Sequence, residues 1–593
     1  MVLSSIDVSF GAYSRAPPSP LGPTVNDDNL TVEKVTEGLE FPTSMAFIGN
    51  NDILVTEKNT GRVMEVKNGQ IQSTPALDVQ VASAVERGLL GIDVSKHPDG
   101  KTYAFIYYTQ SGGGEDGDDF KLGVEPAGNM LYRYEFVNGK LINPSPLLDL
   151  PANPGITNRS DHIGGKVAIG PDNNVYLGVG EVGGHRTLAQ NNVNGSNADG
   201  TSGILMVTQN SQVVSDDPIF GESLPLSIYY AMGIRNSFGM DFDPLTGNLW
   251  DTENGPIGAD EINLVEPGFN SGWALIQGDE SDNILDNGAS ENDLVELGDG
   301  QYSDPEFVWE FPIGVTDLKF LNSGKLGDEY ANNMFVGDIN NGLLYRFTLN
   351  EDRDEIFING TYVGNVEALE DNEVDETPEN AVITFGQGFG GITDLQVGPD
   401  GYLYVLSHKG ELFRILPTSD VKTDISQPNG VMNSSSTIQN VSINSNLNGN
   451  YTPAVIVGID GDESYSPNPI EISVGQTVSW FNGDAISHTV TSGEEDDPDE
   501  GVLFDSGAII PYEDYSLTFS EPGEFDYYCI YHPTMVGEII VNSSDGTFNA
   551  AGPESLAPQN DESSAGDESS AGDESSAGDE SSAGDESSAG DES

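Results

Sequence analysis

Short runs of alternating apolar and polar residues, each followed by a turn, recur along most of the chain. Residues 30–417 contain six such units, in which one alternation leads through a Pro-Asp-Gly type turn into a second alternation that ends near a glycine. KVAIGPDNNVYLGVGEVG and DLQVGPDGYLYVLSHKGELFRIL are examples. A period of two residues is typical of half-buried strands, and the irregular spacing of the units is typical of propeller blades with variable loops. The pattern predicts an all-β fold with a six-bladed β-propeller; stacked β-sandwiches are the alternative.

The segments after the propeller differ from it in composition. Residues 418–453 are rich in Ser, Asn, Gln and Gly and are predicted to be a linker. Residues 454–543 return to alternation, as in YSLTFSEPGEFDYYCIYHPTMVGEIIV, and predict a small β-sandwich. Residues 544–593 carry a repeated acidic DESSAG motif with few apolar residues. We expect this tail to be disordered, because it cannot bury enough apolar surface to offset the entropy of ordering.

The charge of the chain is strongly one-sided. It has 22 Lys and Arg against 97 Asp and Glu, a formal net charge of −75. This balance argues against nucleic acid or an anionic membrane surface as a partner, and it favours solubility in a salty medium or attraction of cations and basic partners. No apolar run approaches the roughly 18 residues that a membrane-spanning helix needs.

Residues 1–29 are interpreted as the remnant of a secretion signal followed by an extension. MVLSSIDVSFGAYS ends in small residues suited to signal cleavage, but its apolar part is short and no basic segment precedes it, so plain disorder is an equal alternative. Asn-x-Ser/Thr sequons compatible with export occur at Asn158, Asn359, Asn433, Asn440 and Asn450. We expect a secreted or cell-surface protein.

The single cysteine of the chain, Cys529, is followed by His532 and Met535 on one loop between predicted strands, and His488 lies upstream. A lone cysteine is usually a small buried apolar side chain. However, a thiolate, two imidazoles and a weak axial thioether form the ligand set of a trigonal electron-transfer copper site, because soft sulfur stabilises Cu(I). The set predicts a type 1 copper site that passes single electrons.

The same residues resemble a known family. SHTV around His488 and YYCIYHPTMVGEIIV around Cys529 are similar to the cupredoxins, and the short Cys-x-x-His-x-x-Met loop looks most like that of amicyanin. The resemblance covers residues 454–542. It implies a Greek-key sandwich with blue copper beneath one end, His532 as the port for electrons, and a redox partner protein.

Within the propeller, Asp161 directly precedes His162 in NRSDHIGGKVAIGPD. A carboxylate beside an imidazole can fix its tautomer and favour the imidazolium, so His162 is a candidate general base. A His-Asp pair is nevertheless more often a hydrogen bond within a loop. Further along, GIRNSFGMDFDP holds Arg235 and Asn236, and ENGPIGADEIN holds a Gly-Pro turn among acidic residues.

ERGLLGIDVSKHPDG, DHIGGKVAIGPD, GIRNSFGMDFDP and ENGPIGADEIN closely resemble the soluble quinoprotein glucose dehydrogenases and the related aldose (glucose/sorbosone) dehydrogenases, over residues 35–417. That family is a six-bladed propeller that holds pyrroloquinoline quinone (PQQ) and Ca²⁺ on its axis and oxidises the anomeric carbon of sugars. The resemblance implies a sugar or other alcohol as substrate, with the hydride chemistry supplied by the quinone. The site residues that it implies are the base His162 with its orienting neighbour Asp161, the quinone contacts Arg235 and Asn236, the substrate-side Glu86, and the Ca²⁺-binding carbonyls of Gly255 and Pro256.

One part of the family pattern is not matched. The family binds the carboxylates of the cofactor with a Lys in the fifth blade and an Arg-x-Arg-Asp segment in the sixth. Here Asn340 stands at the Lys position, and Gly391 and Thr393 stand at the two Arg positions before Asp394. Each missing cation removes a charge-assisted hydrogen bond worth roughly 1.5 to 3 kcal/mol.

Two functions are compatible with the sequence. In the first, a secreted oxidoreductase oxidises a sugar or other alcohol in the propeller and passes the electrons to the tethered copper. In the second, the propeller has lost the quinone and is a binding or scaffold module, and the cupredoxin is a one-electron carrier or copper-binding protein. His162 and Arg235 favour the first function, and the unmatched cation positions favour the second.

Overall fold

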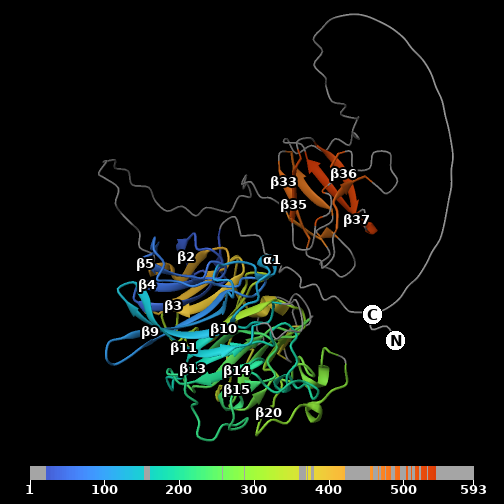
Figure 1. Cartoon of the computed structure of the whole chain (residues 1–593). Coiled ribbons are helices and arrows are strands. Elements are labelled where there is room, and N and C mark those ends of the chain that lie inside the picture. Colours follow the sequence, from blue (N-terminus) through green and yellow to red (C-terminus); the bar gives the residue numbers. More distant parts are fainter. Residues whose placement is uncertain are drawn as a thin grey trace, which may run out of the picture. The chain divides into compact units, whose positions relative to one another are not determined.

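The computed structural model describes residues 22–420, apart from 153–159, 257, 286, 359–368, 370–371 and 375–378, and separate segments within 454–542. The chain divides into two compact units, one containing the described residues of 22–420 and the other most of those of 454–542. Each unit is considered by itself (Figure 1). The predicted linker after 420, the acidic tail and the sequons named above lie outside the described residues.

The described part of the chain is nearly all β, as predicted. The α-helices α1 (Asp119–Leu122) and α2 (Asn380–Ile383) are single turns. The short 3-10 turns are η1 (Leu188–Gln190), η2 (Leu226–Ile228), η3 (Glu280–Asp282), η4 (Glu291–Asp293) and η6 (Thr418–Asp420). Among the described residues, no helix has the length and apolar character needed to cross a membrane.

The first unit contains six β-sheets that follow one another along the chain. The first sheet comprises β3 (Pro42–Gly49), β4 (Asp52–Glu57), β5 (Arg62–Lys67), β6 (Gln70–Ile71) and β7 (Leu77–Asp78). The second comprises β8 (Leu89–Lys96), β9 (Thr102–Gln110), β10 (Gly128–Val137) and β11 (Lys140–Leu150). The third comprises β12 (Val167–Ile169), β13 (Val175–Val179), β14 (Gly203–Val207), β15 (Tyr229–Met232), β19 (Phe269–Asn270) and β20 (Gln301–Tyr302).

The remaining three sheets continue this order. The fourth comprises β16 (Ser237–Phe242), β17 (Leu249–Glu253), β18 (Asp260–Val265), β21 (Phe307–Trp309) and β25 (Glu373–Val374). The fifth comprises β22 (Val315–Phe320), β23 (Met334–Asp338), β24 (Leu344–Phe347), β26 (Thr384–Gln387) and β1 (Thr24–Val25). The sixth comprises β27 (Ile392–Val397), β28 (Leu403–Ser407), β29 (Glu411–Pro417) and β2 (Leu30–Glu37). Because β2 pairs antiparallel with β29, the sixth sheet joins the two ends of this unit.

Each pair of neighbouring sheets encloses an apolar cluster of its own, including the pair formed by the last sheet and the first. In that closing cluster, Met45 and Val55 of the first sheet pack with Tyr404 and Leu406 of the sixth. Burial of one such side chain contributes roughly 1.5 to 3 kcal/mol. The six sheets therefore form a closed ring, which is the arrangement of a β-propeller.

The first strand of each sheet faces the axis of the ring, and glycines let these strands approach closely. A Cβ on Gly91 of β8 would lie 1.9 Å from the carbonyl oxygen of Gly165, just before β12. A Cβ on Gly239 of β16 would lie 2.3 Å from the carbonyl oxygen of Thr316 on β22. Only glycine permits these backbone contacts.

A buried ion network crosses the axis. The Nζ of Lys166 lies 2.7 Å from Asp317 Oδ2 and 2.7 Å from Asp394 Oδ1. The other oxygen of Asp394 accepts a hydrogen bond from the backbone N–H of Met45 at 2.6 Å. Burial raises the pKa of Asp317, and the charge and hydrogen bond of Lys166 oppose that shift. The network connects the first, third, fifth and sixth sheets, and the two carboxylates offset the cost of burying the ammonium.

The second unit consists of two four-stranded sheets. One contains β31 (Tyr465–Ser466), β30 (Ala454–Val457), β33 (Thr477–Asn482) and β35 (Asp514–Thr518). The other contains β32 (Ile470–Ser473), β37 (His532–Asn542), β36 (Gly523–Cys529) and β34 (Thr491–Ser492). Their shared core includes Trp480 and Tyr527, whose rings pack edge to face with centroids 5.5 Å apart. A small β-sheet unit was predicted here.

Candidate active site and copper site

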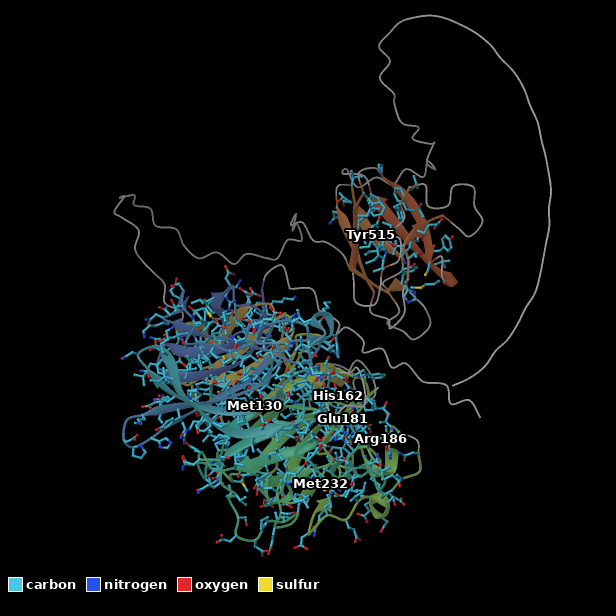
Figure 2. All side chains as sticks on the ribbon, in the orientation of Figure 1. Met130, His162, Glu181, Arg186, Met232 and Tyr515 are labelled. Carbon is cyan, nitrogen blue, oxygen red and sulfur yellow. The ribbon has the colours of Figure 1, made fainter. Side chains whose placement is uncertain are left out.

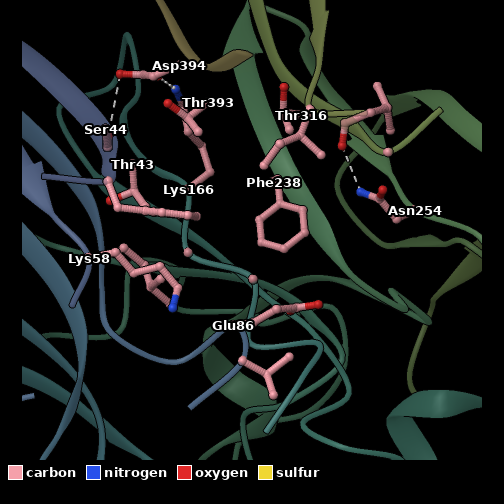
Figure 3. Close-up of a pocket in the computed structure, with 18 residues that line it drawn as sticks. Thr43, Ser44, Lys58, Glu86, Lys166, Phe238, Asn254, Thr316, Thr393 and Asp394 are labelled. Carbon is pink, nitrogen blue, oxygen red and sulfur yellow. Dashed lines mark hydrogen bonds and ion pairs between the residues drawn. The ribbon is translucent and has the colours of Figure 1, made fainter. Parts of the chain in front are cut away.

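A cavity of about 390 Å³ lies on the propeller axis (Figure 3). A volume in this range accommodates a small molecule. Every sheet contributes to its lining; representative residues are Ser44, Leu90, Lys166, Phe238, Thr316 and Thr393. Of the predicted site residues, Glu86 lines the cavity directly.

His162 is buried beside this cavity, and both of its ring nitrogens have partners. Nδ1 lies 2.7 Å from Glu181 Oε1, and Nε2 lies 2.9 Å from Arg235 Nη2. Because a guanidinium only donates, Nε2 acts as the acceptor and the ring proton lies on Nδ1, from which it is donated to Glu181. His162 therefore presents a basic nitrogen toward Arg235. Figure 2 shows His162 and Glu181 together within the propeller.

Glu181 was not singled out from the sequence, whereas Asp161 was expected to orient the base. In the structure Glu181 contacts the orienting nitrogen, and Asp161 Oδ2 lies 3.2 Å from Nε2. Trp273 Nε1 donates to the second oxygen of Glu181 at 3.1 Å. Burial alone would raise the pKa of Glu181, but the hydrogen bonds from His162 and Trp273 and the positive charge of Arg235 outweigh it, so the pKa lies below its ordinary value. Glu181 stays ionised next to the imidazole.

The backbone after β13 holds His162 and Arg235 in place. The N–H of Val182 donates to the carbonyl of His162 at 3.0 Å, and the N–H of Glu181 donates to that of Arg235 at 2.9 Å. A Cβ on Gly180 would lie 2.3 Å from the carbonyl oxygen of His162, so glycine is needed there. His162 itself has a φ of 56°, a left-handed conformation that non-glycine residues adopt mainly where their surroundings enforce it.

Arg235 is anchored on several sides. Nη1 donates to the carbonyl of Asn254 at 2.7 Å, and the guanidinium lies 5.3 Å from the centroid of the Trp273 ring. Its Nε is buried and has no hydrogen-bond partner in the described part of the chain. A buried donor without an acceptor costs about 1 to 3 kcal/mol. A ligand oxygen that accepted a hydrogen bond from this Nε would remove that cost, so the surroundings of Arg235 fit a carbonyl-bearing group.

Asn236 follows Arg235 in the chain and contacts Glu86, which lines the cavity. Its Nδ2 donates to Glu86 Oε2 at 3.2 Å, and its Oδ1 accepts from the N–H of Gly164 at 3.1 Å. The N–H of Ile163 also donates to Glu86 Oε2, at 3.2 Å. The predicted residues Glu86, Asn236, Arg235 and His162 are thus joined in one network at the cavity wall.

The turn predicted to bind Ca²⁺ is held by Asp260. One carboxylate oxygen of Asp260 accepts from the N–H of Gly255 at 2.9 Å, and the other accepts from that of Gly314 at 2.7 Å. Burial raises the pKa of Asp260 to about 6. Gly255 and Pro256 are half-buried. Across the residues that the structure describes, no group of three or more His, Cys, Asp and Glu side chains is placed to hold a metal ion.

The three positions of the unmatched clamp carry no charge in the structure either. Asn340 Nδ2 donates to the carbonyl of Pro312 at 3.2 Å, while its buried Oδ1 has no partner among the described residues. Thr393 lines the cavity and donates to the carbonyl of Leu406 at 3.3 Å. Gly391 has a φ of 45°, and a Cβ there would lie 2.2 Å from His408 Nδ1. A side chain at position 391 therefore has no room.

The residues predicted to bind copper belong to the second unit. The buried side chains of Cys529 and His488 meet with Sγ and Nδ1 3.7 Å apart, and Met535 is buried in the same core. Metal bonds of about 2.3 Å to sulfur and about 2.0 Å to nitrogen, the values for zinc, allow one ion of similar size to bind both atoms. The N–H of Thr489 donates to the Sγ of Cys529 at 3.3 Å, as a thiolate ligand requires of its surroundings.

The fourth predicted ligand is placed only by its backbone. His532 begins β37 and pairs with Cys529 across the β36–β37 turn, and its side chain lies outside the described residues. The donor set that can be placed fits a soft one-electron metal.

Comparison with known proteins identifies one family for each unit. Residues 39–414 match the family described as glucose / sorbosone dehydrogenase, and residues 454–542 match the copper binding proteins of the plastocyanin/azurin family. The aldose sugar dehydrogenase YliI of Escherichia coli is 26% identical over 393 residues, which cover 65% of this chain and 93% of the relative. The quinoprotein glucose dehydrogenase B of Acinetobacter calcoaceticus is 27% identical, covering 47% of this chain and 60% of the relative.

The amicyanin of Paracoccus denitrificans is 36% identical over 92 residues, which are 15% of this chain and 65% of the relative. The chain belongs to the glucose/sorbosone dehydrogenase family and carries, C-terminal to that propeller, a copper-binding domain of the plastocyanin/azurin family.

Proposed function

We propose that the protein is a secreted or cell-surface sugar dehydrogenase that uses PQQ and Ca²⁺ in the propeller and passes electrons to the copper of its second unit. The observation that carries this proposal is His162, whose Nδ1–H is donated to an ionised Glu181 and whose basic Nε2 faces Arg235 beside the axial cavity. The names of the aldose sugar and quinoprotein glucose dehydrogenase relatives support a sugar substrate and a quinone.

In this function, His162 Nε2 accepts the proton of the sugar hydroxyl that is oxidised. Glu181 favours the resulting imidazolium, since its negative charge lies 2.7 Å from Nδ1. Arg235 Nη2 now donates to Nε2, so it must release that nitrogen when substrate enters. Arg235 keeps its bond to Asn254 and can turn its donors to a ligand oxygen.

When bound, PQQ supplies the acceptor for the hydride of the sugar carbon. Arg235 and Asn236 would hold its carbonyl oxygens, and the backbone carbonyls of Gly255 and Pro256 would hold Ca²⁺. Glu86 lines the cavity and can accept a hydrogen bond from a second sugar hydroxyl. These side chains position the sugar carbon and exclude water from the cavity.

In the second unit, His488, Cys529, His532 and Met535 would hold the copper. Oxidation of one sugar releases two electrons and two protons, while a type 1 site takes up one electron at a time. The site must therefore be reduced and reoxidised twice for each sugar, which requires an external redox partner protein.

A scaffold function for the propeller is the second candidate. It is favoured by one observation: Asn340, Gly391 and Thr393 supply no cation for the carboxylates of a quinone. In that case the copper unit alone is redox-active.

One experiment separates the two functions. The purified full chain is incubated with PQQ and Ca²⁺, bound quinone is measured by equilibrium dialysis, and the blue absorbance is followed after sugar is added. The proposal predicts bound quinone and sugar-dependent bleaching in the wild type. A His162→Gln variant should bind the quinone without bleaching. Absence of quinone binding at high micromolar concentration would favour the scaffold.

A further inference from the structure

Two lysines line the axial cavity, and they differ in how their charges are balanced. Lys166 forms ion pairs with Asp317 and Asp394. Lys58 also reaches the cavity, but within the described part of the chain no carboxylate is close enough to form an ion pair with it. In Figure 3, Lys58 and Glu86 lie in the lower part of the view, below Lys166 and Asp394.

The ammonium of Lys58 is held by neutral groups. Its Nζ lies 3.1 Å from Asn59 Oδ1 and 3.4 Å from the carbonyl oxygen of Ser83, and it lies 5.6 Å from the centroid of the Phe41 ring. Its side chain is 7% exposed, and its stem packs so closely on Gly88 that a Cβ there would lie 2.6 Å from Lys58 Cγ. Lys58 is thus a buried lysine that lines the cavity, with its stem fixed against Gly88.

Burying the Lys58 ammonium without a full counter-charge disfavours its charged form. Burial lowers the pKa of Lys58 to about 8, although the charges of Glu86 and Asp119 oppose this shift. Asp119 is also bonded by Arg87, and Glu86 accepts from Asn236 and Ile163, so both carboxylates are engaged elsewhere. His408, which packs against Phe41, is a further titratable side chain near Lys58. An anion entering the cavity would offset the cost of the buried charge.

We propose that Lys58 binds a carboxylate of the ligand that occupies the axial cavity, and thereby supplies from the first sheet the positive charge that Asn340, Gly391 and Thr393 do not supply. This inference rests on the proposed function and assigns the ligand to one chemical class, a planar aromatic quinone with carboxylate groups, for which PQQ is the probe. Position 391 cannot accommodate an arginine in this backbone, so in this chain the positive charge has to come from another position.

The proposal makes the affinity dependent on pH. The carboxylates of the probe stay ionised above neutral pH, whereas Lys58 in the ligand-free protein loses its proton near pH 8. The dissociation constant should rise about tenfold between pH 7 and pH 9, and binding at pH 9 should take up a proton. An arginine at position 58 stays charged over this range and should remove the dependence.

The test is equilibrium binding of PQQ to the full chain with Ca²⁺ present, measured at pH 7 and pH 9. Lys58→Met should weaken binding about 10- to 100-fold at pH 7, the usual span for losing one charge-assisted contact. Lys140→Met, which removes an equally positive but exposed lysine, is the matched control and should bind like the wild type. Lys58→Arg should bind with little difference between the two pH values.

The outcomes separate this inference from the function on which it rests. Wild-type affinity in Lys58→Met, or an equal loss in Lys140→Met, overturns the inference and leaves the proposed function in place. Absence of PQQ binding by the wild type overturns both. If Lys58→Met does not fold, Lys58→Arg decides: a pH dependence like that of the wild type overturns the role of Lys58, and a flat profile supports it.

Discussion

The copper site and the axial site of the propeller are assembled from the chain in different ways. Cys529 and Met535 flank a single strand turn, and His488 comes from a neighbouring segment of the same small core. His162, Glu181 and Arg235 lie on loops of the third and fourth sheets, and their positions depend on how those sheets pack around the ring. Most of the first site comes from one turn of a small unit, while the second depends on the closure of the whole ring.

This difference predicts how each site responds to damage. A substitution in the copper loop should act directly on ligand chemistry, because few residues mediate the geometry. In the propeller, residues that never touch a ligand should matter, because the glycine contacts and the buried ion network set the distances between loops. The following tests run from the largest expected effect to the smallest.

The largest effect is expected at Cys529. Copper-loaded wild type should be blue from the thiolate-to-copper transition, and Cys529→Ser should abolish the colour, because a hydroxyl cannot form the soft covalent bond. The measurement is the visible absorbance of the copper-loaded full chain. Met535→Leu is the control, since a weak axial ligand should alter the colour without removing it. A colourless wild type would contradict the assignment.

The next largest effect is expected at Glu181, the carboxylate that contacts the proposed base His162. Glu181→Gln keeps the size of the side chain but removes the charge beside Nδ1, so sugar oxidation should slow by roughly 10²- to 10⁴-fold, comparable to the loss of general-base assistance. Turnover of the quinone-loaded enzyme is measured, with quinone binding as the check on integrity. Asp161→Asn should have the smaller effect, because Asp161 does not contact Nδ1. The reverse order would restore Asp161 as the orienting residue.

The sequence allowed these two sites to be predicted to different extents, for physical reasons. The propeller follows from strand periodicity, and three of the four predicted copper ligands follow from side-chain chemistry on one short loop. Glu181 could not be found in the same way. Its contact with His162 forms only when β13 pairs with β12 and brings the segments that carry the two residues together. Its position in GVGEVGG, a charge among glycines at the end of an apolar strand, is the signal that was available. Likewise, the space for a side chain at position 391 is limited by His408, and the sequence alone does not show that these two residues are neighbours.

The ion network on the axis should matter more than any surface pair. Lys166→Met leaves Asp317 and Asp394 buried without their cation, and loss of one partner of a buried pair typically costs about 3 to 5 kcal/mol of unfolding free energy. Lys67→Met removes an exposed pair with Asp52 and should cost about 0 to 1 kcal/mol. Denaturant unfolding of both variants gives the comparison. Equal losses would mean that the axial network contributes no more than the surface.

Rebuilding the clamp gives a smaller and opposite effect. Asn340→Lys should tighten PQQ binding by about 10- to 100-fold, because a new charge-assisted contact forms in a partly dehydrated cavity. Thr393→Arg is the second variant to test, because Thr393 lines the cavity. Gly391→Arg should instead destabilise the propeller, since its Cβ would collide with His408. Equilibrium dialysis measures the affinity. No gain from either rebuilt cation would indicate that the ligand carboxylates lie elsewhere in the cavity.

The effect that is smallest per pH unit concerns Asp251, a buried carboxyl group on β17. Burial raises the pKa of Asp251 to about 7. Between about pH 4 and pH 7 the folded state keeps a proton that the unfolded chain releases, so this group makes the propeller less stable as the pH rises, by about 1.4 kcal/mol per pH unit. Asp251→Asn removes the titration and should flatten the dependence of unfolding free energy on pH, whereas the exposed Asp217→Asn should not. Denaturant unfolding between pH 5 and pH 8 measures both slopes, and parallel curves for Asp251→Asn and the wild type would show that Asp251 ionises at its ordinary pKa.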